Sequence, residues 1–240
     1  MLRCAGGKVS LSKGNAFSMS DDYKSKKFSV SVKGENNIIT IGNNFNNYDF
    51  GLTINGRNNE IIIGDNFTNK GICRIVVIGS NNKIIIGDDI LIVTRLTVYN
   101  HDNSQNCKIT IGNKTSFYKT EISNYDNGSS IKIGEDCMFA YDTIVYNTDG
   151  HSIFQNGVLI NKACDLIIGD HVWCGWGSVI LKNVHIPNGC IIGKSAVVAK
   201  KFDKENTAIA GNPAKVIKEN ILWNRKSVNE TIKSDVPLQQ

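Results

Sequence analysis

The sequence lacks long apolar stretches. None of its apolar runs approaches the roughly 18 residues that a membrane-spanning helix needs. The first residues, MLRCAGGKVSLSKG, also lack the apolar segment of a secretory signal. We therefore expect a cytoplasmic protein with no membrane span.

Paired cysteines are also missing. The 7 cysteines are an odd number, and no two of them are separated by two residues, so the sequence predicts neither a disulfide framework nor a zinc site, and we expect no metal. Cys137, Cys174 and Cys190 fall where the repeat described below requires a small inward residue. We expect these three to be inert core residues rather than nucleophiles.

The sequence has little excess charge of either sign. A formal net charge of +5 suits an anionic cofactor or acceptor but identifies no partner. Basic clusters interleaved with aromatic residues are missing, so we do not expect nucleic acid as a partner.

What the sequence does contain is an uninterrupted six-residue repeat from Ile168 to Phe202. The first residue of each hexad is apolar: Ile168, Cys174, Ile180, Ile186, Ile192 and Val198. The fifth is small or apolar, apart from a bulky last member: Val172, Ser178, Val184, Cys190, Ala196 and Phe202. This period fits neither an amphipathic helix nor a lone strand. It fits a chain that turns a corner every six residues, which predicts an all-β parallel β-helix.

A longer phrase repeats upstream, beginning with NNIITIGNNF and NNEIIIGDNF. Its glycines are 22, 23, 25, 22 and 35 residues apart: Gly42, Gly64, Gly87, Gly112, Gly134 and Gly169. Three six-residue sides need only about 18 residues, so each coil must carry extra residues at one corner. Asn-Asn and Asn-Gly pairs suit such a corner because both residues tolerate left-handed backbone. Low-complexity disorder is the alternative reading of the asparagines, and the regular isoleucines argue against it.

These repeats predict three regions. Residues 1–35 form an N-terminal capping segment, residues 36–217 form the parallel β-helix, and residues 218–240 form a helix, around 218–226, followed by a tail. The step of 35 residues reflects an interruption at about 147–166, and an inserted segment of this length in a solenoid is usually functional.

The C-terminal repeats and the interrupting loop resemble a known family. VWCGWGSVILKNVHIPNGCIIGKSAVVAKKF, then AIAGNPAKVI, and the loop NTDGHSI are similar to the hexapeptide-repeat acyltransferases, in the branch of sugar, xenobiotic and polysaccharide O-acetyltransferases. The resemblance implies a left-handed β-helix, acetyl-CoA as co-substrate and a carbohydrate acceptor. It also implies a homotrimer with active sites between neighbouring subunits.

The resemblance assigns roles to three residues. His151 matches the general base, and a neutral imidazole has a pKa suited to taking a proton from a hydroxyl; the alternative is a surface histidine in a polar loop. Asp149 either orients the His151 ring or caps the turn of the loop, and Asp142 is a weaker candidate for the same orienting role. Trp173 matches the tryptophan of the family's VWIG motif beside the active site, or it covers the coil edge.

By position, the resemblance also places the donor. The residues expected to line the pantetheine arm, together with Trp173, are Ser178, Ala196 and Ala199. The lysines expected to meet the phosphates are Lys200, Lys215 and Lys218. Otherwise these lysines simply solvate the surface.

Similar phrases recur at 98–102, 123–126 and 145–149, in three successive coils. We expect them to stack along one edge that ends at the loop and hypothesise an acceptor groove there. Its proposed substrate-binding residues are Tyr99, Asn100, Tyr125, Tyr146 and Asn147. A simple run of asparagine turns is the alternative.

The sequence thus predicts an acetyl-CoA-dependent O-acetyltransferase that acts on a carbohydrate hydroxyl of a bacterial surface polysaccharide, such as capsule or lipopolysaccharide, or its precursor. One alternative is N-acetylation of an amino sugar on the same scaffold. Another is a non-catalytic β-solenoid binding module, which could dispense with the loop histidine and the terminal lysines.

Overall fold

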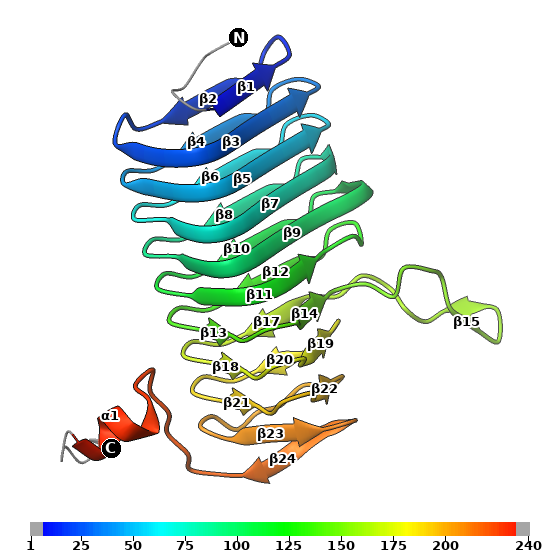
Figure 1. Ribbon diagram of the computed structural model, residues 1–240. Coiled ribbons are helices and arrows are strands. Elements are labelled where there is room, and N and C mark those ends of the chain that lie inside the picture. The colour runs from blue at the N-terminus through cyan, green and yellow to red at the C-terminus, as the bar shows by residue number, and fades with distance from the viewer. Residues whose placement is uncertain (1–6, 234–240) are drawn as a thin grey trace.

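Isoleucines at alternate positions build the coils of the structure. The computed structural model describes residues 7–233, apart from the side chains of residues 101, 102 and 233. Ile39, Ile61 and Ile84 lie in register on parallel strands of three successive coils, and all three are fully buried. Figure 1 shows the coils stacked into a column in which the chain winds with a left hand. The left-handed parallel β-helix confirms the predicted fold class.

Two sheets run along the column. The 14-stranded sheet consists of β1 (Gly7–Leu11), β3 (Tyr23–Lys33), β5 (Phe45–Asn55), β7 (Thr68–Ser80), β9 (Leu91–Gln105), β11 (Ser116–Ser123), β13 (Met138–Phe139), β14 (Thr143–Tyr146), β18 (Trp173–Cys174), β19 (Val179–Leu181), β21 (Ile191–Ile192), β22 (Val197–Val198), β23 (Ala208–Gly211) and β24 (Ala214–Lys218). The eight-stranded sheet consists of β2 (Ala16–Met19), β4 (Ile38–Ile41), β6 (Glu60–Ile63), β8 (Lys83–Ile86), β10 (Lys108–Ile111), β12 (Ser130–Ile133), β17 (Leu166–Ile168) and β20 (His185–Ile186). Outside them lie the hairpin strands β15 (Phe154–Gln155) and β16 (Val158–Leu159) and the helix α1 (Val228–Lys233).

The extra residues of the upstream coils lie at one corner. Four asparagines there adopt left-handed backbone with φ of 54° to 58°: Asn36, Asn58, Asn81 and Asn106. Phe28 pairs with Phe50, 22 positions later, whereas downstream of the loop Ile167 pairs with His185, 18 positions later. The interrupting loop leaves the column at this same corner, between β14 and β17. It is therefore an enlarged version of the asparagine corner.

Residues 7–35 belong to the stack itself. β1 pairs in parallel with β3, and β3 pairs in parallel with β5, so the coils start well before the expected boundary at residue 36. The Phe28 ring stacks on Phe50 with ring centroids 5.4 Å apart. The expected boundary came from the first Ile-Gly phrase. The alternating sequence from Phe28 to Val32 forms a coil strand without that phrase, so the coils begin earlier than expected.

The C-terminal helix begins later than the expected range of 218–226. Ser227 and Glu230 form a capping box: the Ser227 N–H donates to Glu230 Oε2 at 2.7 Å, and the Glu230 N–H donates to Ser227 Oγ at 3.3 Å. This box fixes the start of α1 at Val228. The expected helical range is wrong because residues 219–227 instead cross back over the coil corners.

The expected core position of three cysteines is confirmed. Cys137, Cys174 and Cys190 are fully buried in the core. Burial raises the pKa of the Cys137 thiol to about 12 and holds the pKa of Cys174 well above its usual value, which favours the protonated form of both thiols.

Nowhere in residues 7–233 is a helix long and apolar enough to cross a membrane.

Candidate active site

His151 lies at the base of a protruding loop. The chain leaves the column after Tyr146, forms the antiparallel hairpin β15–β16 and returns at Leu166 (Figure 1). An open cavity of about 490 Å³ lies at the loop base, and the exposed His151 lines it together with Tyr125, Asp149 and Lys162. The predicted base thus faces solvent beside a tyrosine of the proposed acceptor groove.

The backbone around His151 is fixed by Asn161. The Asn161 amide donates to the His151 carbonyl at 2.7 Å and to Asp149 Oδ2 at 3.0 Å. Its oxygen accepts the Ile153 N–H at 2.8 Å. One side chain from the returning half of the loop therefore holds both ends of the segment that carries the histidine.

Lys182, on the next coil, ties this network to the column. Its Nζ lies 2.5 Å from Asp149 Oδ2 and donates to the Asn161 carbonyl at 3.0 Å. The side chain is only 14% exposed. Sequence reasoning missed Lys182 and Asn161, because neither belongs to the loop motif and their contacts form only when the loop folds back on itself and onto the next coil.

Asp149 holds the loop rather than the histidine ring. Its pKa is lowered by the hydrogen bond from Lys182, assisted by Asn161. Among the described side chains, none hydrogen-bonds the ring of His151. The geometry favours the loop-capping alternative. Asp142 pairs with Lys119 at 2.5 Å and lines a different cavity.

The three similar phrases do stack in register, as predicted. Tyr99 and Tyr146 both pair with Ser123 of the coil between them. The Tyr125 and Tyr146 rings meet edge to face with centroids 5.9 Å apart. Tyr125 lines the His151 cavity, whereas Tyr99 lines a separate cavity of about 260 Å³ with Arg95. The tyrosines therefore do not form one continuous groove.

Asn100 and Asn147 are buried, which corrects their assignment to the acceptor groove. The Asn147 amide donates to the Cys164 carbonyl at 2.9 Å and to the Ser130 carbonyl at 3.0 Å. It thus closes the base of the loop. An inward asparagine at this corner satisfies backbone groups that the wide turn leaves unpaired.

On the donor side, the predicted contact of Ser178 and Ala196 with the pantetheine arm stays a prediction. Both are fully buried. Their N–H groups bond within their own turns, to Gly175 and Gly193, and their carbonyls accept N–H groups of the neighbouring coil. Among the polar groups of these two residues, the buried Ser178 Oγ is left without a hydrogen-bond partner within residues 7–233. The repeat itself had placed both side chains inward.

The terminal lysines divide into two sets. Lys200 and Lys215 line one cavity of about 690 Å³, together with Lys201 and His185. This cavity gathers several cationic or titratable side chains on the last coils. Lys218 is exposed and lies outside the cavity lining, and Ala199 is exposed beside Lys200.

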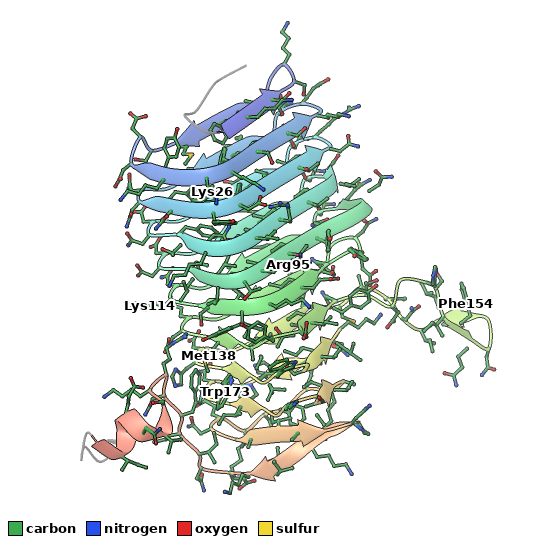
Figure 2. All side chains as sticks on the ribbon, in the orientation of Figure 1. Lys26, Arg95, Lys114, Met138, Phe154 and Trp173 are labelled. Carbon is green, nitrogen blue, oxygen red and sulfur yellow. The ribbon has the colours of Figure 1, made fainter. Side chains whose placement is uncertain are left out.

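Trp173 lies on β18, between Met138 of the preceding coil and Ile191 of the next. It is 36% exposed and lines a third cavity, with Met138 and Trp223. In Figure 2 Trp173 lies on the column, far from Phe154 in the hairpin that follows His151. One chain does not bring the predicted base and this tryptophan into one cavity.

Within residues 7–233, no group of three or more metal-ligating side chains is placed to hold an ion.

A hexapeptide β-helix with a histidine on an inserted loop and lysines on its last coils defines the class of hexapeptide-repeat acyltransferases. No family model matches the sequence. The chain is 38% identical to the polysialic acid O-acetyltransferase of Neisseria meningitidis over 136 residues, which are 56% of this chain and 63% of that protein. It is 39% identical to the polysialic acid O-acetyltransferase of Escherichia coli O1:K1 over 108 residues, 44% of this chain and 35% of that protein. These matches span less than two thirds of either relative.

Solved structures extend the likeness to nearly the whole chain. The polysialic acid O-acetyltransferase OatWY is 30% identical with a TM-score of 0.63, covering 95% of this chain and 96% of that one. The polySia-specific acetyltransferase NeuO is 27% identical with a TM-score of 0.67, covering 96% and 94%. The chain belongs to the family of hexapeptide-repeat O-acetyltransferases.

Proposed function

We propose that this protein transfers an acetyl group from acetyl-CoA to a carbohydrate hydroxyl of a bacterial surface polysaccharide or its precursor. The observation that carries the proposal is the placement of His151: its backbone is fixed by Asn161, while its ring faces an open cavity. The relatives named for polysialic acid support a surface glycan as acceptor. A donor made in the cytoplasm favours a cytoplasmic site of action.

His151 would act as the general base. Its ring takes the proton of the acceptor hydroxyl as the oxygen attacks the carbonyl carbon of the thioester. A backbone N–H at the coil edge stabilises the oxyanion, the C–S bond then breaks, and the thiolate of CoA takes the proton back from the imidazolium. No covalent acyl-enzyme is required, which agrees with the buried, protonated Cys137 and Cys174.

The lysine cavity on the last coils suits the phosphates of CoA. Lys200, Lys201 and Lys215 present ammonium groups around one space, and compact ammonium groups bind phosphate as point charges. Lys201 and His185 join the residues expected from the sequence. Lys218, outside the lining, is a weaker candidate.

We further propose a homotrimer with active sites between subunits. His151 and Trp173 line different cavities of one chain, so a shared site needs a second copy. The hairpin also exposes four apolar side chains between 48% and 64%: Ile153, Phe154, Val158 and Ile160. An apolar arm of this kind gains free energy by packing against a neighbour.

N-acetylation of an amino sugar is the second candidate, since the same base can take the proton that an amine releases as it attacks the thioester. Mass spectrometry of the product before and after mild base separates the two reactions, because esters hydrolyse and amides survive. A non-catalytic binding module would give no product at all.

The test is the variant His151→Ala. We expect kcat to fall by at least about 10²-fold, because the general base is lost, while CoA binding measured by calorimetry stays unchanged. Gln155→Ala, an exposed change in the same hairpin, is the matched control. Full turnover by His151→Ala would overturn the assignment.

A further inference from the structure

The segment after β24 runs back over the column beside Trp173. We name residues 221–227 the C-terminal clasp. The Ile221 N–H donates to the Asn206 carbonyl at 2.9 Å, and the clasp then passes the corner that precedes β18 and β13. Most of its residues are exposed, but Trp223 is only 8% exposed. The clasp therefore makes its contacts through a few side chains.

Arg225 anchors the clasp across two coils. Its Nε donates to Asp136 Oδ1 at 2.8 Å, Nη1 donates to Ser116 Oγ at 2.7 Å, and Nη2 donates to the carbonyls of Lys114 and Cys137 at 3.1 and 2.9 Å. Burial would raise the pKa of Asp136, but the hydrogen bonds from Arg225 and His171 outweigh it and lower that pKa. A planar guanidinium with four hydrogen bonds fixes both the position and the direction of the clasp.

Trp223 is held on the ring of His171. The two rings stack with centroids 4.0 Å apart and planes 12° apart. Trp223 Nε1 donates to the His171 carbonyl at 2.9 Å, while His171 Nε2 lies 3.0 Å from the Trp223 carbonyl. His171 Nδ1 lies 2.7 Å from Asp136 Oδ2, which joins this contact to the Arg225 anchor.

The stacked pair lies next to Trp173, which follows His171 by two residues. The Trp223 and Trp173 ring centroids are 6.0 Å apart with planes 46° apart. The two indoles, with Met138, Leu222 and Ile232, line an open cavity of about 450 Å³. The Trp173 indole is 36% exposed, and the Trp223 ring packs beside it on the side of the clasp. The Arg225 anchor and the stacked pair thus form one connected network, which reaches Trp173 through Trp223.

We propose that Trp223 and Arg225 are positioning residues that fix the Trp173 indole in the orientation the reaction uses. This rests on the proposed function, in which Trp173 and the His151 of a neighbouring subunit belong to one active site. Catalysis is sensitive to such placement, since a displacement of about 1 Å can cost about 10²-fold in rate.

The first measurement does not depend on activity. Trp173 becomes the single tryptophan in the full chain carrying Trp176→Phe and Trp223→Phe, because the sequence has 3 tryptophans. Phe at 223 keeps the stacking ring. Adding Arg225→Ala is expected to raise the acrylamide quenching of Trp173 fluorescence about twofold, since the clasp loses four hydrogen bonds. Adding Arg57→Ala, which removes an exposed arginine from a distant corner, is the matched control.

The second measurement is kinetic and uses the native tryptophans. Arg225→Ala is expected to lower kcat by about 10- to 10²-fold at saturating donor and acceptor, with KM for acetyl-CoA changed less. The kcat of Trp223→Phe should lie between the kcat of Arg225→Ala and that of the unmodified protein. A thermal melt identifies any variant that fails to fold, and Arg225→Lys, with fewer hydrogen bonds, then replaces it.

The two readouts separate the proposals. Unchanged quenching of Trp173 overturns the clasp as a positioning element, whatever the activity. Raised quenching with unchanged kcat also overturns it and leaves the clasp with a purely structural role. If the unmodified protein transfers no acetyl group, the proposed function fails, and the quenching still decides whether the clasp holds Trp173.

Discussion

At the scale of single residues, the sequence motif and the contacts in the folded chain identify different residues of the candidate site. The loop motif points to His151, whose proposed role as a base depends on the chemistry of its own side chain. It did not identify Lys182, which contacts Asp149 and the Asn161 carbonyl from the next coil. A lysine in a regular hexad looks like a solvated surface residue until the coil is folded. Ser178 shows the reverse case: the resemblance places it beside the pantetheine arm, while its own hexad predicts the inward side chain that the structure shows.

Replacing Lys182 with methionine tests this positioning. The change keeps most of the side-chain volume but removes the ammonium that binds both halves of the loop. We expect kcat to fall about 10-fold, less than for His151→Ala, with faster hydrogen exchange in residues 148–162. Lys132→Met, at an exposed position on β12, is the control and should leave both measurements unchanged. Unaltered exchange in the loop would contradict the role of Lys182.

At the scale of elements, inward asparagines explain why the upstream coils are wide yet ordered. Asn59 donates to Asn37 Oδ1 at 2.9 Å and to the Gly79 carbonyl at 2.9 Å, and its oxygen accepts the Asn82 N–H at 3.0 Å. All three asparagines are buried and lie one coil apart. The side-chain ladder replaces backbone hydrogen bonds that the wide corner cannot make. Each asparagine of this ladder bonds to the coils on both sides. The sequence pattern therefore predicted the wide corner but not the side-chain hydrogen bonds across it.

Removing one asparagine of this ladder should destabilise the protein. Asn59→Ala leaves the Gly79 carbonyl and the Asn82 N–H without their partner in a buried site. We expect the free energy of unfolding to fall by about 2–4 kcal/mol, since each unsatisfied buried group costs about 1–3 kcal/mol. Asn46→Ala, at an exposed position on β5, should change it by less than about 0.5 kcal/mol. Equal losses in urea denaturation of the two variants would refute the ladder.

The ends of the column were the least predictable elements. The first coils have alternating apolar residues without the Ile-Gly phrase, so repeat matching started at residue 36 although β1 and β3 already pair. The helix expected at 218–226 does not form because Trp223 and Arg225 bond to distant coils. Local propensity carries no information on such contacts. The S-x-x-E spacing of Ser227 and Glu230 was the available signal for the true start of the helix.

At the scale of the whole molecule, one chain carries the parts of the proposed site on separate surfaces. His151 is at the hairpin corner, Trp173 faces the C-terminal clasp, and the two line different cavities. The exposed apolar hairpin extends away from the column (Figure 1). A ring of subunits joins unlike surfaces of neighbours, which is how a heterologous interface would bring these parts together.

Mixing two defective chains tests this arrangement. His151→Ala and Trp173→Ala are each expected to be nearly inactive as pure proteins. If each site takes the histidine from one subunit and the tryptophan from the next, about a quarter of the sites in randomly mixed trimers are intact, because each half of a site is intact with a probability of about one half. Co-expression should thus restore about a quarter of the normal kcat. Light scattering should give about three times the chain mass of 26.4 kDa. Mixed oligomers without restored activity would show that each chain completes its own site, and a monomeric mass would exclude the trimer.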